Sequence, residues 1–303
     1  MTTLTRREFV ILPAAALATE ATTVLTPAFA QPSSPLIARA IPASGEPLPT
    51  VGLGTAGVFD RADEVTRQKA SAVVQSLISN GGKLIDTAST YGDAESVLGD
   101  VMALAGLRDK LFIATKLESP DVDELKRSLR RLQTEKLDLL QLHNVSNPQQ
   151  SLAVFKEWKA QGVCRYVGIT STFHGAFPAV EAVLAREKPD FVQIDYSIED
   201  REAEKRILPL AGDSKAGVLT ALPFGRGRLF RTVRGKTLPD WASEFAGSWA
   251  QFFLKYLLSD PRVTAVIPGT GNATHMTDNL GAMRVPLPDA DQRRRMVQFV
   301  EAL

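Results

Sequence analysis

Short apolar runs alternate with longer amphipathic stretches from Thr50 to the end of the chain. Eight runs are rich in β-branched residues or leucine, the pattern typical of parallel strands buried on both faces. The expected strands are Thr50–Gly54, Lys83–Thr87, Leu111–Lys116, Leu137–His143, Val163–Thr170, Phe191–Tyr196, Gly217–Leu222 and Val263–Pro268. Helical patterns fill the intervals; one is expected over Arg67–Ser79, and another over Glu202–Ala211 with its stop at Gly212.

This strand–helix alternation predicts an α/β fold, a single (β/α)8 TIM barrel over residues 50–303. An open, doubly wound sheet is the alternative, and it requires a glycine-rich turn that leads directly into a helix. Gly52, Gly54 and Gly57 follow an early strand, but no clear helix begins after them. Asp86, at the end of the next strand, is followed by a loop unlike the ribose-binding type. We therefore expect the barrel.

The charge balance limits the classes of partner that the sequence leads us to expect. The 303 residues contain 35 Lys and Arg against 34 Asp and Glu, a formal net charge of +1. Near-neutrality gives no reason to expect nucleic acid or an acidic membrane as partner. Cys164 is the one cysteine, which excludes an intramolecular disulfide, and three histidines do not favour a His-rich metal site. A small-molecule ligand and no metal are expected.

The first thirty residues have the features of an export signal. Thr5-Arg6-Arg7-Glu8-Phe9-Val10 matches the twin-arginine pattern, an Ala-rich apolar stretch follows, and Ala28-Phe29-Ala30 resembles a cleavage site. Residues 1–30 are therefore predicted to be a signal peptide, cleaved near Ala30 after delivery by the twin-arginine machinery to the periplasm or another extracytoplasmic space. Glu20 interrupts the apolar stretch, which argues against a stable membrane anchor. The alternative for residues 1–30 is a disordered or helical tail that contains Arg-Arg by chance. Residues 31–49 are expected to form an N-terminal arm.

Four polar residues stand at or just after the ends of consecutive expected strands: Asp86, Tyr91, Lys116 and His143. Because the carboxyl ends of barrel strands meet at one face, these side chains should converge. Asp86 would pair with Lys116, and that lysine is expected to lower the pKa of the Tyr91 phenol. Tyr91 could then protonate a developing alkoxide while His143 orients the carbonyl. Each residue alone has a structural alternative, but together they predict carbonyl reduction by a supplied hydride.

The sequence resembles the aldo-keto reductases over residues 48–283. The resemblance is carried by Ile85-Asp86-Thr87-Ala88-Ser89-Thr90-Tyr91-Gly92, Ala114-Thr115-Lys116, Leu137-Asp138-Leu139-Leu140-Gln141-Leu142-His143 and Val192-Gln193-Ile194-Asp195-Tyr196. It implies that Asp86, Tyr91, Lys116 and His143 are the catalytic tetrad of a reductase that uses NADPH and no metal.

The resemblance also implies a cofactor site. Gly54, Thr55, Ala56 and Asp86 are expected to contact the cofactor, and Thr170, Ser171 and Gln193 are expected to hold its nicotinamide amide. A basic loop is expected to lie along the pyrophosphate, through Pro223, Gly225, Arg226, Gly227, Arg228 and Leu229. The alternative is a loop that is only solvated and binds no phosphate. The residues expected on the adenosine side are Gly269, Thr270, His275, Asp278 and Asn279.

Two of these positions depart from the family pattern. Ala221 stands where the family usually has an aromatic side chain against the nicotinamide. His275 stands where an arginine often binds the 2′-phosphate, and a neutral imidazole binds phosphate more weakly than a guanidinium. We expect NADP to be preferred over NAD by a small margin, with NAD usable.

The substrate pocket is expected to be walled by Val58, Phe59, Tyr91, Leu117, His143, Asn144 and Phe224. Short flanking loops and a short C-terminal segment predict an open pocket for a small carbonyl compound. Two other functions are compatible with the sequence. One is an exported nicotinamide-nucleotide-binding sensor or partner module with vestigial catalysis. The other is a Schiff-base lyase that uses Lys116 as nucleophile. The intact set of four residues favours the reductase.

Overall fold

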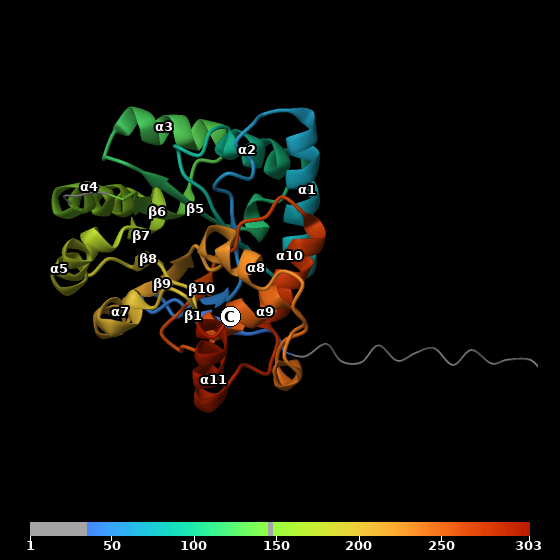
Figure 1. Cartoon of the computed structure of the whole chain (residues 1–303). Coiled ribbons are helices and arrows are strands. Elements are labelled where there is room, and N and C mark those ends of the chain that lie inside the picture. The colour runs from blue at the N-terminus through green and yellow to red at the C-terminus, as the bar shows by residue number, and fades with distance from the viewer. Residues whose placement is uncertain (1–34, 145–147) are drawn as a thin grey trace, which may run out of the picture. The chain divides into compact units, whose positions relative to one another are not determined.

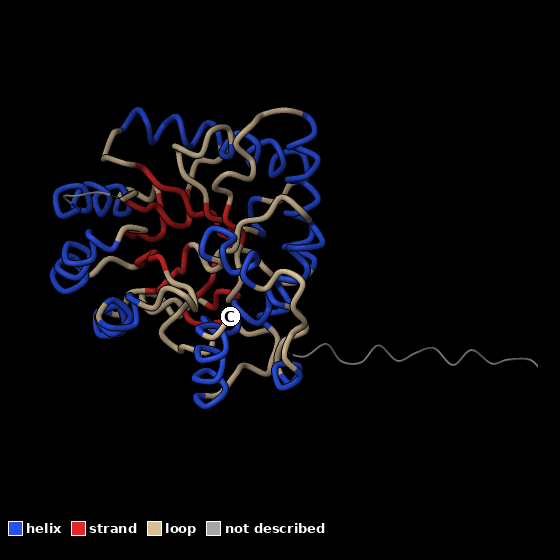
Figure 2. The backbone as a smooth tube through the Cα atoms, in the orientation of Figure 1, coloured by secondary structure: helices blue, strands red, loops and turns tan. Residues whose placement is uncertain are grey.

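A computed structural model describes residues 35–144 and 148–303. Its main sheet has eight parallel strands, each hydrogen-bonded to the next in the chain (Figures 1 and 2). The strands are β3 (Leu53–Gly54), β4 (Leu84–Asp86), β5 (Phe112–Leu117), β6 (Leu137–Leu142), β7 (Cys164–Ser171), β8 (Phe191–Asp195), β9 (Gly217–Ala221) and β10 (Ala265–Val266). Each lies within or close to one of the eight apolar runs.

The sheet closes on itself between β3 and β10. The amide of Gly52 donates to the Val266 carbonyl at 2.9 Å, and that of Gly54 donates to the Pro268 carbonyl at 3.0 Å. A Cβ at Gly54 would lie 2.9 Å from the Ile267 carbonyl oxygen, so glycine lets these two edges meet. The predicted (β/α)8 barrel is confirmed.

Helices surround the strands, as Figure 2 shows. They are α1 (Glu64–Ser79), α2 (Ala94–Ala105), α3 (Val122–Arg131), α4 (Pro148–Ala160), α5 (Phe177–Glu187), α6 (Glu202–Lys205), α7 (Ile207–Ser214), α8 (Arg228–Thr232), α9 (Trp249–Leu258), α10 (Ala273–Leu280) and α11 (Ala290–Glu301). The helix expected over Glu202–Ala211 is instead two, divided at Arg206, and α7 continues past Gly212 to end where Lys215 adopts a positive φ of 58°. Within the described ranges no helix combines the length and apolarity that crossing a membrane requires.

Two apolar layers hold the barrel together. The outer layer lies between the strands and the helices and includes Val73, Leu140 and Phe252. The inner layer fills the barrel with side chains such as Phe112 and Leu219. Neighbouring strand residues point to opposite faces, so each buried strand contributes to both layers. This explains why the runs read as continuously apolar.

A β-hairpin covers the amino-terminal end of the barrel. Its strands, β1 (Ala38–Ala40) and β2 (Pro47–Pro49), pair antiparallel. Ile41 and Leu48 are fully buried and belong to the same apolar cluster as the interior side chains of the barrel. Much of the segment expected to be an arm is therefore packed structure.

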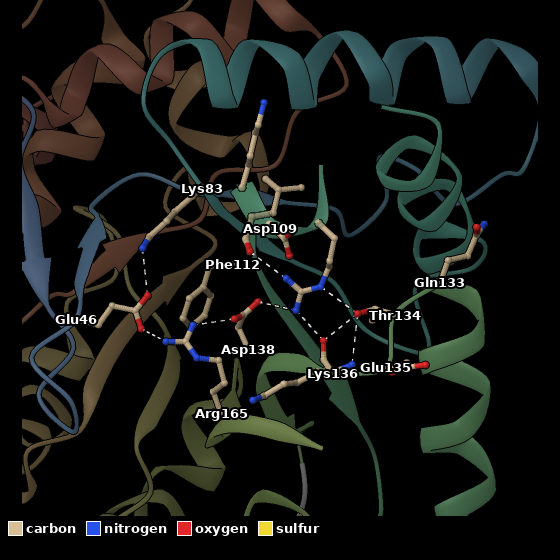
Figure 3. A pocket seen from close by; sticks show the side chains of 13 residues that line it. Glu46, Lys83, Asp109, Phe112, Gln133, Thr134, Glu135, Lys136, Asp138 and Arg165 are labelled. Atoms are coloured by element: carbon tan, nitrogen blue, oxygen red, sulfur yellow. Dashed lines mark hydrogen bonds and ion pairs between the residues drawn. The ribbon is translucent and has the colours of Figure 1, made fainter. Parts of the chain in front are cut away.

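A charged cavity of about 540 Å³ lies at this same end, beside the starts of β5, β6 and β7 (Figure 3). Glu46 of the hairpin pairs with Lys83 at 3.2 Å and with Arg165. Asp138 pairs with Arg165 at 2.9 Å and with Arg108 at 3.0 Å. The five side chains alternate in sign and link the hairpin to β6 and β7 and to the segments just before β4 and β5. We interpret them as a structural network, because each carboxylate pairs with two of the three cations.

Candidate active site

A second cavity of about 540 Å³ opens at the carboxyl ends of the strands, away from the hairpin. Strand ends and loops from most of the barrel contribute to it. Its lining consists of Gly54, Thr55, Ala56, Asp86, Tyr91, His143, Asn144, Thr170, Thr172, Gln193, Ala221, Leu222, Pro223, Phe224, Arg226, Gly227, Phe230, Ile267 and Gly269. Barrel enzymes share the strand framework and differ in the loops at this end, and so they catalyse different reactions there.

A buried ion pair adjoins this cavity through Asp86, which lines it. Asp86 ends β4, and Lys116 lies near the end of the adjacent strand β5. The Lys116 Nζ donates to Asp86 Oδ2 at 2.5 Å and to the Thr87 carbonyl at 2.7 Å. The two side chains are 1% and 4% exposed. A buried ammonium with two oxygen acceptors stays fixed in place, as an unpaired one would not.

Tyr91 and His143 stand over this pair. The Lys116 Nζ lies 4.9 Å from the centroid of the Tyr91 ring. The ring centroids of Tyr91 and His143 are 5.7 Å apart and nearly perpendicular, at 81°. The structure thus brings together all four residues that the strand-end pattern singled out.

The protonation of the two rings follows from burial. Desolvation raises the pKa of Tyr91 above its ordinary value, although the nearby charge of Lys116 acts in the opposite direction. Lys116 has the expected lowering effect on this pKa, but burial outweighs it, so the net direction is upward. Burial and the Lys116 charge together lower the pKa of His143 to about 4. At neutral pH the site therefore holds a protonated phenol and a neutral imidazole.

Several residues that line the cavity were not expected there. They are Thr172, Leu222, Phe230 and Ile267. Phe230 belongs to the short helix α8 that follows the basic loop, and its ring centroid lies 4.7 Å from that of Phe224. No motif marked Phe230, because its position depends on how the loop turns back over the barrel.

Three expected pocket residues lie elsewhere. Leu117 follows Lys116 on β5 and therefore points to the opposite face, where it is fully buried in the outer layer. Phe59 is buried in that same layer. Val58 is not among the residues that line the cavity and packs against the outer layer.

Some expected cofactor residues also lie off the cavity. The Ser171 hydroxyl bonds the backbone of Phe173, and Arg228 pairs with Glu199 at 3.1 Å. Asp278 accepts hydrogen bonds from Ser248 and Gln251 and so links α10 to α9. The remaining members of this set outside the lining are Gly225, Leu229, Thr270, His275 and Asn279.

The polar groups that line the cavity fit a nicotinamide dinucleotide. The Nε2 of Gln193 is buried and has no hydrogen-bond partner among the described residues. Such an orphaned donor is costly unless a ligand satisfies it, and a carboxamide oxygen would do so. Arg226 and Gly227 line another part of the same cavity, where a guanidinium and backbone amides suit phosphate.

A cluster of His174, Asp195 and Asp200 lies near this end of β8. Their ligand atoms all lie within 4.8 Å of one another, and His174 Nε2 is 3.0 Å from Asp200 Oδ2. Burial, followed by the charge of Asp200, raises the pKa of Asp195 to about 6. The charges of Arg226 and Arg228 act on Asp195 in the opposite direction. These cations offset the carboxylates, and we assign the cluster an electrostatic role.

Comparison with known proteins agrees with this geometry. The model of the aldo/keto reductase family matches residues 50–297. The chain belongs to the aldo/keto reductase family. Among curated members, it is 28% identical over 256 residues to methylglyoxal reductase YeaE of Escherichia coli, covering 80% of this chain and 88% of that protein.

Solved structures show the same fold. An aldo/keto reductase from Klebsiella pneumoniae, in complex with NADP and acetate, superposes with a TM-score of 0.72 at 24% identity, covering 84% of this chain and 93% of that one. The glycerol dehydrogenase of Gluconobacter oxydans gives a TM-score of 0.72 at 22% identity, with coverages of 88% and 95%.

Proposed function

We propose that this aldo/keto reductase uses NADPH to reduce an aldehyde or ketone to an alcohol. The observation that carries the proposal is the buried Asp86–Lys116 pair beneath Tyr91, with the ring of His143 nearly perpendicular to that of Tyr91. The similarity to a methylglyoxal reductase supports a small carbonyl compound as the substrate.

The cofactor would lie across the cavity. Gln193 and Thr170 would hold the nicotinamide end, and Arg226, Gly227 and Gly269 would face the remainder. When bound, NADPH supplies the hydride. The crystallisation of a structural neighbour with NADP supports this choice, and we propose a modest preference over NAD.

The chain itself supplies the proton and the orientation. Tyr91 keeps its proton at neutral pH, so it can donate that proton to the oxygen of the reduced carbonyl. Lys116 lies close enough to stabilise the phenolate that Tyr91 becomes. Neutral His143 can still donate one hydrogen bond to the carbonyl oxygen, which fixes the direction from which the carbonyl is presented.

The test is oxidation of NADPH with a panel of aldehydes, including methylglyoxal, for the wild type and Tyr91→Phe. We expect turnover by the wild type and a loss of at least about a hundredfold in the variant. Tyr166→Phe is the control, because that phenol hydrogen-bonds Glu46 at the opposite end of the barrel. Nucleotide binding without turnover of any aldehyde would instead support the sensor or partner module.

We further propose that the protein is exported through the twin-arginine pathway. The support is the order of motifs in residues 1–30, which lie outside the described part of the structure. Such export accepts folded proteins, so the nucleotide could be loaded beforehand. Native mass spectrometry of the extracytoplasmic fraction should find a chain that begins at Gln31 with nucleotide bound. A full-length chain in the cytoplasm alone would refute export and leave the proposed reaction untouched.

A further inference from the structure

The two oxygens of the Asp86 carboxylate have different partners. Oδ2 accepts the hydrogen bond from Lys116, while Oδ1 accepts one from the side-chain amide of Gln141, with Nε2 at 3.1 Å. Gln141 lies on β6, directly opposite Lys116 in the strand register, and its side chain is fully buried. A second polar side chain therefore reaches the carboxylate from the strand next to the lysine.

The barrel accommodates this amide at a cost. The Oε1 of Gln141 is buried without a hydrogen-bond partner among the described residues. Burying a half-satisfied amide is unfavourable compared with an apolar side chain. Leu139, two residues earlier on the same strand, shows that the interior accepts an aliphatic side chain. Packing alone gives no reason for an amide at this position.

The neighbouring strand leaves room for it. Gly168 of β7 is the register partner of Gln141. A Cβ at Gly168 would lie 3.2 Å from Gln141 Cγ and 3.0 Å from the Phe191 carbonyl oxygen. The position beside Gln141 is thus kept free of a side chain.

We propose that Gln141 is a positioning residue for carbonyl reduction. Its amide holds the Asp86 carboxylate so that Oδ2 faces Lys116, and the carboxylate in turn holds the ammonium beneath Tyr91. A neutral donor does this without adding charge to the pair. The inference rests on the proposed function, since it describes how the same site is kept in order.

Gln141→Met tests it, because methionine keeps the length and unbranched shape and removes the amide. We expect kcat to fall about tenfold or more, as for loss of a hydrogen bond to a charged group, with KM for NADPH unchanged within about twofold.

Gln141→Glu keeps the side-chain shape and tests the same contact through the pH dependence of activity. At low pH the introduced carboxyl group is protonated and can donate to Asp86, so activity should be retained. Activity should fall as the pH rises, because two carboxylates then face each other. Leu139→Met is the control, and it should keep the wild-type kcat and pH profile.

The outcomes separate the two proposals. Wild-type kcat in Gln141→Met, in a wild type that reduces aldehydes, would overturn the role of Gln141 alone. If Gln141→Met does not fold, a pH profile of Gln141→Glu identical to that of the wild type would overturn it equally. Failure of the wild type to reduce any carbonyl would overturn the proposed function and this inference together.

Discussion

His143 stands edge-on to Tyr91, and the Lys116 charge acts on both rings. The same ammonium that favours the phenolate of Tyr91 also disfavours a second cation on His143. Burial nevertheless keeps the Tyr91 phenol protonated, and burial together with the lysine charge keeps the His143 imidazole neutral, so the phenol is the acid available at neutral pH.

The pH dependence of catalysis follows from this arrangement. The pKa of His143 is lowered from 6.5 to about 4, so the imidazole is neutral throughout the range above that value. We expect no inflection in kcat from this residue between about pH 5.5 and 8. A pH–rate profile compared with that of His143→Gln measures it. An inflection near 6.5 that disappears in the variant would show that the imidazole titrates normally.

Breaking the ion pair should affect both stability and catalysis. Lys116→Met leaves the Asp86 carboxylate buried without its cation, which typically costs about 3–5 kcal/mol of unfolding free energy. We also expect kcat to fall by at least about a hundredfold. Denaturant unfolding and NADPH oxidation measure the two effects. The double variant Asp86→Asn with Lys116→Met should recover stability but not activity; recovery of both would show that the pair is only structural.

Replacing the orphaned amide should weaken cofactor binding. Gln193→Leu removes the buried donor that lines the cavity, and we expect KM for NADPH to rise about tenfold. Because the nicotinamide is common to NADPH and NADH, both should be weakened by the same factor. Fluorescence titration with each nucleotide checks this. A loss confined to NADPH would place Gln193 near the 2′-phosphate instead.

The His174–Asp195–Asp200 cluster should make stability depend on pH. The pKa of Asp195 is raised from 3.8 to about 6, so the folded protein favours the protonated carboxyl. Its contribution to stability is complete below about pH 4 and is lost as the pH rises through 6. Asp195→Asn should therefore raise Tm by a few degrees at pH 7 and leave it unchanged at pH 4. Asp213→Asn, on an exposed part of α7, is the control and should show no such difference.

The charge network under the barrel should affect folding without affecting the reaction. Arg165→Met removes contacts with Glu46 and Asp138, while Asp138 retains Arg108. We expect a loss of about 1 kcal/mol in unfolding free energy, because Arg165 is partly exposed. The kcat should not change. A reduced kcat in a fully folded Arg165→Met variant would show that the network influences the active site, contrary to our interpretation.

The strands and the four central residues could be predicted because their signals are local. Each strand is a run of apolar residues, and Lys116 or His143 interrupts such a run at its end. The pocket walls could not be predicted in this way. Phe59 lies in a loop and Phe230 in the short helix α8, and the first is buried in the outer layer while the second lines the cavity. That difference arises from the path of the loops, which no local pattern specifies.

The pKa of Tyr91 illustrates a second limit. The sequence indicated a lysine near the phenol and hence the sign of one electrostatic effect. It did not indicate how deeply the phenol lies, and burial determines the net direction. Likewise, Gln141 appeared only as part of an apolar strand until the register placed it beside Lys116.

The hairpin makes the two ends of the barrel different, and this difference can be used to orient the molecule. It occupies the end of the barrel opposite the cavity, and the chain enters the described structure just before it. A tether attached ahead of Ala38 would consequently anchor the enzyme by its closed base. The open mouth would then face the solution, which suits immobilisation on a bead or electrode without blocking access of either the nucleotide or the carbonyl compound.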